Sequence, residues 1–406
     1  MTVPLHAPLS RPRETPAVTP AVTPGEATAL LDAYRPGDRF LATPGRTLLG
    51  TGTAAEIPHD PAVPVGERVR GALDARRAAG DPAPVVIGCL PFLPDAPPAL
   101  AVPAALRRGP ALRHDPLTAL EPPAPTAPGG WDLHEVPSAA AYARAVDAAV
   151  ERLRAGEFAK VVLARTLELT GRPAPELPLM LGRLARRDPH GYAFAVPSGP
   201  GRTLLGASPE LLVARQHGRL VANPLAGSAP RGADLAEDVR AAAALLDSPK
   251  DLHEHAVVVD AVREALAPYC ARIDVPARPT LVRTATMWHL STTVTGDLAS
   301  PATTALDLAQ ALHPTPAVCG TPTATAREVI AASEPFDRGA YTGMVGWQDA
   351  DGDGEWVVTL RCAEAEGDTL RLFAGAGVVA ASTGEAEAAE TAAKFRTFLD
   401  AVGAAL

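Results

Sequence analysis

The sequence predicts an α+β fold with large, mainly antiparallel sheets flanked by helices and built as two related halves. Stretches of strand composition are clustered rather than alternating regularly with helices, at residues 160–169, 355–360 and 370–373. Helical patterns are long and separate from these clusters, at residues 139–153, 235–246, 249–266 and 384–399. The run PGRTLLG occurs twice, at residues 44–50 and 200–206, which indicates a duplicated architecture.

The elements of the N-terminal part follow from local signals. Residues 1–27 are Pro-rich and are expected to form a flexible leader. Residues 25–34 fit a short helix, and residues 39–52 fit a strand, a turn and a second strand, because Pro-Gly stands where the hairpin turn would lie. A second Pro-rich stretch at 121–130 is the best candidate boundary, dividing the chain into residues 28–130 and 131–406.

Composition excludes several classes of protein. The chain has 406 residues, 47% of them hydrophobic, which is ample for a core. Its formal net charge of −9 argues against a nucleic-acid partner, since phosphates need basic neighbours. There is no apolar run that predicts a signal peptide or membrane span. The four cysteines are far apart in sequence, which favours reduced thiols and a cytoplasmic location.

Two predicted helices carry paired carboxylates. Asp251 and Glu254 are three residues apart and share a helix face, as do Glu387 and Glu390, with Lys394 one turn further on. Both helices start with capping-box patterns, at Ser248 and Ser382. If the helices meet, the oxygen ligands would suit Mg²⁺ rather than zinc. Spacing alone favours solvated acidic faces that complement the helix dipoles, because charged helix faces usually face water.

One acidic run imitates a calcium loop. Asp349, Asp351 and Asp353 alternate before Gly354, but the glutamate that should complete such a loop is replaced by Leu360. The flanking residues have strand composition, so a hairpin turn between Trp347 and Trp356 is the better interpretation.

Seven runs, in order and at matching spacing, resemble the chorismate-binding enzyme family. They are KVVLAR at 160–165, GASPELL at 206–212, PLAGSA at 224–229, KDLHEH at 250–255, LHPTPA at 312–317, GEWVVTLRC at 354–362 and LFAGAGV at 372–378. The likeness covers about residues 131–399 and extends weakly to 40–52 and 90–102. EPFDR at 334–338 and GMVGW at 343–347 are most similar to siderophore-type isochorismate synthases.

The resemblance implies a chorismate-utilising fold, with 131–406 as the chorismate-binding catalytic region, continuous with 28–130. It implies Mg²⁺ as the cofactor, with Glu254 and Glu390 as direct ligands and Asp251 and Glu387 behind them. It also implies Lys160 as the general base and Glu210 as the general acid. The substrate-binding residues would be Arg361, Gly227, Gly375, His289 and Ala317.

The implied reaction adds water at C2 of chorismate and expels the C4 hydroxyl. A base must activate the water and an acid must protonate the departing oxygen. Lys160 could be kept neutral by burial and by nearby positive charge, with Mg²⁺ and Arg165 as candidates. Glu210 could stay protonated in an apolar pocket. Because chorismate is a dianion, the metal would reverse the local negative charge for the substrate.

Three alternatives remain open from the sequence. A salicylate synthase would share the same residues and then eliminate pyruvate. An aminating enzyme of the anthranilate synthase type is disfavoured, partly because Ala226 stands where the aminodeoxychorismate synthases tend to carry lysine. A non-catalytic ligand-binding relative has no chemical need for Lys160, Glu210, Glu254, Glu390 and Arg361 together. The resemblance favours a monomer, and siderophore, menaquinone and antibiotic pathways remain possible.

Overall fold

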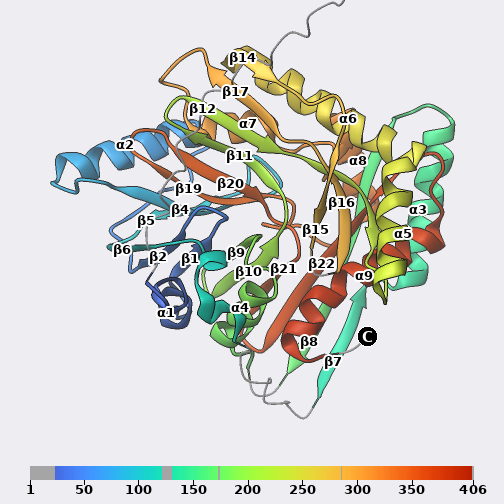
Figure 1. The fold of residues 1–406 in the computed structure, drawn as a ribbon, viewed down its shortest axis with the longest axis horizontal. Coiled ribbons are helices and arrows are strands. Elements are labelled where there is room, and N and C mark those ends of the chain that lie inside the picture. Colours follow the sequence, from blue (N-terminus) through green and yellow to red (C-terminus); the bar gives the residue numbers. More distant parts are fainter. Residues whose placement is uncertain (1–22, 121–129, 172–173, 285, 405–406) are drawn as a thin grey trace, which may run out of the picture.

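Two large antiparallel sheets pack against each other, with helices on their outer faces (Figure 1). The computed structural model describes residues 23–120, 130–171, 174–284 and 286–404. All strand pairs in this part of the chain are antiparallel, so the predicted α+β class with large antiparallel sheets is confirmed.

The first sheet has ten strands in the order β18-β8-β22-β21-β10-β9-β1-β2-β6, with β7 also paired to β8. Its members are β1 Arg39–Ala42, β2 Thr47–Thr51, β6 Ala105–Gly109, β7 Trp131–Val136, β8 Lys160–Gly171, β9 Tyr192–Gly199, β10 Arg202–Ser208, β18 Gly320–Thr321, β21 Cys362–Glu366 and β22 Thr369–Val378. The long pair β8 and β22 runs in register from Val161 with Val378 to Thr170 with Thr369.

The second sheet has nine strands in the order β14-β17-β12-β11-β20-β19-β4-β5-β3, and a small third sheet has the order β13-β16-β15. Those of the second sheet are β3 Ala55–Glu56, β4 Val85–Leu90, β5 Ala99–Val102, β11 Leu211–Gln216, β12 Arg219–Asn223, β14 Cys270–Asp274, β17 Val294–Leu298, β19 Met344–Asp349 and β20 Gly354–Val358. The third sheet contains β13 Leu225–Pro230, β15 Thr280–Arg283 and β16 Met287–Ser291.

Helices cover both sheets with their apolar faces. The first sheet is covered by α1 Glu26–Ala33, α3 Ala139–Arg154, α4 Leu177–Arg187, α8 Thr323–Ser333 and α9 Gly384–Val402. The second sheet is covered by α2 Val65–Ala78, α6 Pro249–Leu266 and α7 Ala305–Leu312. Helix α5 Leu235–Asp247 packs on the small third sheet, and three short 3₁₀ helices span Leu112–His114, Pro116–Ala119 and Ala267–Tyr269.

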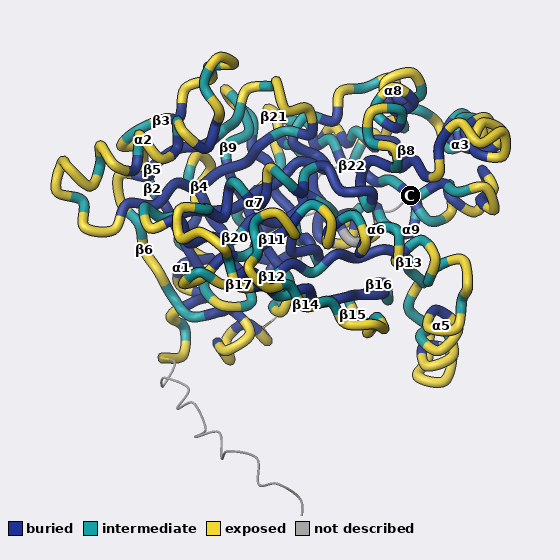
Figure 2. Tube along the Cα trace, turned by 90° about the horizontal axis from the view of Figure 1, so that it is seen from above, coloured by how far each residue is buried: buried dark blue, intermediate teal, exposed yellow. Residues whose placement is uncertain are grey.

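A central core lies between the two large sheets. It includes Leu41 and Phe194 from the first sheet and Trp347 and Val357 from the second. Figure 2 shows the buried strands running through the middle of the molecule, with exposed positions at the helices and turns around it. Burial of this apolar surface on both sides of the interface stabilises the sheet packing.

The PGRTLLG repeat forms two neighbouring hairpins in the first sheet. Hairpin β1–β2 carries the first copy and hairpin β9–β10 the second, and β1 pairs directly with β9. The arginine of each copy forms an ion pair with a glutamate. Arg46 Nε lies 3.5 Å from Glu355 Oε1, and Arg202 Nη1 lies 3.4 Å from Glu364 Oε1. The repeated sequence therefore corresponds to a repeated local structure.

The predicted elements are confirmed with small shifts at their ends. The helices expected at 139–153, 235–246, 249–266 and 384–399 are α3, α5, α6 and α9. The run with three aspartates is the hairpin turn between β19 and β20, as expected. Residues 1–22 of the predicted leader at 1–27, and residues 121–129 of the predicted boundary at 121–130, lie outside the described residues. The last two leader residues, Glu26 and Ala27, belong to helix α1. Residues 28–130 supply strands to both large sheets, and no described helix is long and apolar enough to cross a membrane.

Candidate active site

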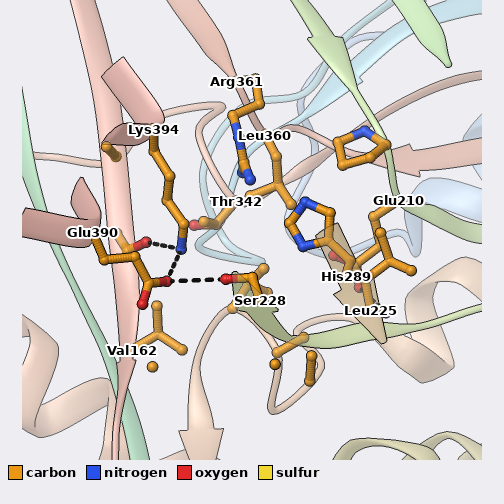
Figure 3. A pocket seen from close by; sticks show the side chains of 18 of the residues that line it. Val162, Glu210, Leu225, Ser228, His289, Thr342, Leu360, Arg361, Glu390 and Lys394 are labelled. Atoms are coloured by element: carbon orange, nitrogen blue, oxygen red, sulfur yellow. Dashed lines mark hydrogen bonds and ion pairs between the residues drawn. The ribbon is translucent and has the colours of Figure 1, made fainter. Parts of the chain in front are cut away.

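A cavity of about 230 Å³ opens where the first sheet, the third sheet and helices α6 and α9 meet (Figure 3). Its walls come from distant parts of the chain: β8 and β22, the β10–β11 and β20–β21 connections, β13 and β16, and the segments before β18 and β19. The cavity therefore depends on the complete fold rather than on any local motif.

Lys160 and Glu254 are brought together beside this cavity. Lys160 begins β8, its side chain is 3% exposed, and its Nζ lies 2.8 Å from Glu254 Oε1. Glu254 lines the cavity, whereas Lys160 is not among the lining residues. A Cβ atom at Gly377 would stand 2.6 Å from Glu254 Oε1 and 3.1 Å from Lys160 Cε. Glycine at 377 thus leaves room for the ion pair.

The expected influence of Arg165 on Lys160 is wrong. The two residues are five positions apart in one strand and so project from opposite faces of the sheet. Arg165 Nη1 lies 2.8 Å from Glu135 Oε1, and its Nε donates to Thr391 Oγ1 at 2.9 Å. Arg165 consequently ties α9 to the outer face of β8 and is not among the cavity-lining residues.

Glu210 is held at the turn between β10 and β11. Its backbone N–H donates to Ser208 Oγ at 3.2 Å, and Ser208 Oγ in turn donates to the carbonyl oxygen of Val358. The carboxyl group is buried and accepts one hydrogen bond, from the Leu225 N–H at 3.4 Å. Burial raises the pKa of Glu210 to about 7, so the protonated carboxylic acid is accessible near neutral pH.

The two carboxylate-bearing helices are capped as their sequences suggest, with one shift. Ser248 is the N-cap of α6 and accepts a hydrogen bond from the Asp251 N–H at 3.3 Å. Helix α9 is capped by Thr383, which accepts from the Ala386 N–H, rather than by Ser382. Ser382 Oγ instead accepts from the Val379 N–H, which fixes the segment leading into the helix.

Three of the four predicted acidic residues line the cavity. These are Asp251, Glu254 and Glu390; Glu387 is buried next to them without lining it. Burial and the nearby Glu390 raise the pKa of Glu387 above its usual value. Within the described residues, no three His, Cys, Asp or Glu side chains are close enough together to hold a metal ion. The four carboxylates therefore neighbour one another without forming a closed metal cage.

Lysine side chains pair with three of these carboxylates, Glu254, Glu387 and Glu390, whereas Asp251 accepts a hydrogen bond from Ser248 Oγ. Lys394 Nζ lies 2.6 Å from Glu390 Oε1 and donates to the Gly375 carbonyl oxygen at 2.8 Å, and Lys250 Nζ lies 3.7 Å from Glu387 Oε1. Lys250 and Lys394 line the cavity, a role that the sequence analysis missed. The signal for Lys394 was present, because Glu390 and Lys394 are four residues apart on one helix face.

The opposite wall holds buried polar groups that lack partners. His289 Nε2 and Arg361 Nη2 have no hydrogen-bond partner within the described part of the chain. Burial and the nearby Arg361 hold the pKa of His289 well below its usual value, so its imidazole is neutral. Arg361 has φ 47°, a left-handed conformation that is unusual for a residue with a side chain. Buried polar atoms without partners are rare in folded proteins, and a polar ligand would satisfy them.

The predicted glycines and Ala317 also line the cavity. Gly227 has φ 76°, and a Cβ there would approach Asp251 Cβ to 3.0 Å. A Cβ at Gly375 would lie 2.7 Å from the Tyr341 hydroxyl. Tyr341 stacks on Phe373 with ring centroids 5.0 Å apart, and both rings line the cavity. Sequence reasoning missed these two aromatic residues.

The donor set fits a magnesium ion. Asp251, Glu254 and Glu390 offer carboxylate oxygens from two facing helices, and Mg²⁺ prefers oxygen ligands, with one or two carboxylates completed by substrate and water. The room that Gly377 leaves at Glu254 is compatible with a change of partner there. Together with Arg361, His289 and Glu210, the site combines positive and negative elements suited to a small, anionic, hydroxylated substrate.

Comparison with known proteins gives consistent matches. A family model described as chorismate binding enzyme matches residues 114–403. Isochorismate synthase DhbC of Bacillus subtilis is 48% identical over 388 residues, covering 93% of this chain and 96% of that protein. The vibriobactin-specific isochorismate synthase of Vibrio cholerae is 40% identical over 368 residues, covering 90% and 91%. A crystal structure described as 2,3-dihydroxybenzoate-specific isochorismate synthase, DhbC, from Bacillus anthracis has a TM-score of 0.88 and 45% identity, covering 93% and 100%.

Proposed function

This chain belongs to the chorismate-binding enzyme family, and we propose that it is an isochorismate synthase that interconverts chorismate and isochorismate. The observation that carries the proposal is the cavity in which Glu210, Arg361 and His289 face the paired carboxylates of α6 and α9. Relatives named isochorismate synthases support the assignment over nearly the whole chain. The likeness to siderophore-type enzymes favours a siderophore pathway.

We assign Glu210 the role of general acid. A C–O bond forms at C2 of the ring while the C4–O bond breaks and the double bonds shift between these positions. Departure of hydroxide from C4 requires a proton, and the buried Glu210 with its raised pKa can donate one near neutral pH. In the reverse direction, the Glu210 carboxylate accepts the same proton.

We assign Lys160 the role of general base toward the attacking water. Its amine would take the proton that the water loses, leaving an ammonium when the new hydroxyl has formed. In the structure Lys160 is ion-paired with Glu254, so base catalysis requires Glu254 to leave the ammonium and allow proton loss. Glycine at 377 gives both side chains room to separate.

We assign substrate binding to the polar groups of the deep wall. Arg361 can form a fork-like contact with the enolpyruvyl carboxylate, using the Nη2 donor that has no partner within the described residues. The neutral His289 can exchange a hydrogen bond with a ring hydroxyl. Gly227, Gly375 and Ala317 leave space for the ring close to the backbone.

We assign Mg²⁺ to Glu254 and Glu390 as direct ligands, with Asp251 and Glu387 supporting them. Bound Mg²⁺ would supply positive charge that attracts the ring carboxylate of a dianionic substrate. The ion would reverse the local charge of the carboxylates, which would explain how an acidic protein with a net charge of −9 can bind an anion.

Product analysis tests the proposed function. Purified protein is incubated with chorismate and Mg²⁺, and isochorismate, salicylate, anthranilate and pyruvate are resolved by chromatography. We expect isochorismate without pyruvate, loss of turnover after chelation, and recovery when Mg²⁺ is restored. Pyruvate formed in proportion to chorismate consumed would instead identify a salicylate synthase, and ammonium-dependent anthranilate would identify an aminating enzyme.

A further inference from the structure

The segment between α8 and β19 contains an ion pair, Glu334 with Arg338, in which both side chains are buried. Glu334 and Arg338 are each 3% exposed at their side chains. Arg338 Nε donates to Glu334 Oε2 at 2.8 Å and Arg338 Nη2 donates to Glu334 Oε1 at 2.5 Å. The contact is therefore a two-point fork, the strongest geometry for a guanidinium and a carboxylate.

The remaining bonds of this pair all reach segments that form the cavity wall. Arg338 Nη2 also donates to the Val162 carbonyl oxygen at 2.8 Å, while Nη1 donates to the Val318 carbonyl oxygen at 2.9 Å and to Thr342 Oγ1 at 3.2 Å. Val162, Val318 and Thr342 line the cavity. These contacts and the fork use every N–H donor that a guanidinium has.

Glu334 adds a fourth attachment. Its Oε1 accepts a hydrogen bond from the Ala164 N–H at 2.8 Å, on the same strand as Val162 and Lys160. Residues 160, 162 and 164 project to one face of β8, and the ion pair holds the backbone of this strand two and four residues beyond the proposed base. The Phe92 ring covers the Arg338 guanidinium at 4.7 Å and keeps water from these bonds.

Thr342 shows what this arrangement holds in place. It has φ 57°, a strained conformation for a β-branched residue, and it is fully buried. Besides the bond from Arg338, the Thr342 N–H donates to the Thr359 carbonyl oxygen at 2.9 Å. The Thr342 carbonyl oxygen lies 2.9 Å from His313 Nε2. Such a conformation persists when its surroundings over-determine it.

Stability alone explains this pair poorly. A buried ion pair loses hydration that its attraction often fails to exceed, and apolar side chains of similar size can replace such pairs without loss. Here the pair instead connects three separate chain segments at one wall of the cavity. We propose that Glu334 and Arg338 are positioning residues that fix β8 with Lys160, and the Val318 and Thr342 wall, relative to the substrate. This inference rests on the proposed function.

The test compares two changes of the pair with the parent enzyme. Arg338→Lys keeps the charge but cannot reach all the acceptors, and the double change Glu334→Gln with Arg338→Met removes both charges. We expect kcat to fall about 10- to 100-fold in both, since displacement of a catalytic group by about 1 Å has effects of this size. Mg²⁺ affinity, measured by calorimetry, should stay within about twofold of the parent, because Arg338 contacts neither α6 nor α9 in the hydrogen bonds described above.

A second buried ion pair provides the matched control. Arg215 and Asp353 are 6% and 12% exposed, are hydrogen-bonded to each other, and do not line the cavity. Arg215→Met with Asp353→Asn should lower the melting temperature while leaving kcat, KM and Mg²⁺ affinity within about twofold of the parent.

The outcomes separate the inference from the proposed function. The isochorismate synthase activity of the parent enzyme is measured first, and its absence would reject the proposed function. With an active parent, folded Arg338→Lys protein whose kcat is within about twofold of the parent would overturn the positioning role. An equal fall of kcat in the Arg215 control would also overturn it, because stability loss alone would then account for the effect. If the double variant does not fold, the Arg338→Lys result decides.

Discussion

The two sides of the cavity differ in how their charges are balanced (Figure 3). On the helix side, Glu390 pairs with Lys394, as Figure 3 shows. Glu254 pairs with Lys160, and Glu387 pairs with Lys250. On the sheet side, Glu210 makes no ion pair within the described residues, and His289 Nε2 and Arg361 Nη2 have no hydrogen-bond partner there. One side is neutralised by the protein itself, whereas the other is left incomplete.

This difference indicates how each side meets its ligand. Buried polar groups without partners raise the free energy of the folded protein, and a ligand that satisfies them recovers that energy as binding. If the sheet side binds chorismate as proposed, its polar groups are already in place before the substrate arrives. If Mg²⁺ binds the helix side as proposed, Glu254 and Glu390 would have to exchange their lysine partners for the cation.

The largest expected effect concerns Lys160, the proposed general base. Lys160→Ala should lower kcat by about 1000-fold, because general base catalysis contributes about 100- to 10,000-fold. Chorismate binding, followed by calorimetry, should remain measurable since Arg361 and His289 are intact. The exposed Arg219, 75% exposed at its side chain and paired with Asp297, supplies a control: Arg219→Ala should be fully active. Full activity of Lys160→Ala would remove the proposed base.

The helix side is tested by Glu390→Gln. Loss of this charge should weaken Mg²⁺ binding about 100-fold, since even groups that merely support a metal ligand contribute about 10- to 100-fold. Calorimetric titration with Mg²⁺ gives the affinity directly. Asp260→Asn changes an exposed carboxylate on α6 and should leave the affinity unaltered. An unchanged affinity for the Glu390 variant would reject its role as a ligand.

The sheet side is tested by Arg361→Met. Removal of a charged hydrogen-bond donor from a buried site should raise KM for chorismate about 10- to 100-fold. Mg²⁺ affinity should change little, because the guanidinium belongs to the other side of the cavity. Steady-state kinetics at saturating Mg²⁺ separates KM from kcat. If KM stays at the parent value, the enolpyruvyl carboxylate must bind elsewhere.

The pH dependence of kcat/KM should reflect the protonation state of Glu210. Its pKa of about 7 means that the acid loses its proton above neutral pH, so kcat/KM should fall about tenfold per pH unit beyond pH 7. The folded-state pKa lies above the usual 4.5, so the stability that this group contributes is complete below pH 4.5 and is lost as pH rises through 7.

Unfolding in urea measures the same group independently of activity. Between pH 5 and pH 8 the parent protein should lose about 2 to 3 kcal/mol relative to Glu210→Gln, which has no proton to lose. An identical pH dependence of stability in parent and variant would show that the Glu210 carboxyl is not perturbed.

Much of the fold was predictable because it follows local rules. Helix α6 begins at the capping residue Ser248, and its apolar stripe, including Val258 and Val262, gives the buried face. Hairpin β1–β2 follows from Pro-Gly at its turn. The order of strands in each sheet was not predictable, because it is set by contacts between residues as far apart as Phe40 and Ala195.

The sequence predicted which residues form the site better than it predicted how they are arranged in space. Glu254 and Glu390 could be found from helical spacing, and Lys160 and Glu210 from resemblance. Arg165 was misassigned although its odd spacing from Lys160 in one strand already placed it on the other face of the sheet. Arg338 belongs to the EPFDR run that supported the resemblance, but its buried ion pair and the strained backbone of Thr342 could not be predicted, since both arise from tertiary packing.

The most direct test of the proposed mechanism follows the source of the oxygen atom in the C2 hydroxyl of isochorismate. The enzyme is incubated with chorismate and Mg²⁺ in water enriched in oxygen-18, and isochorismate is analysed by mass spectrometry at low conversion. The account predicts one heavy oxygen in the product, located in the C2 hydroxyl, because water is added there while the C4 hydroxyl leaves. Unlabelled isochorismate would contradict it, since the hydroxyl would then have moved within the molecule without Lys160 activating water.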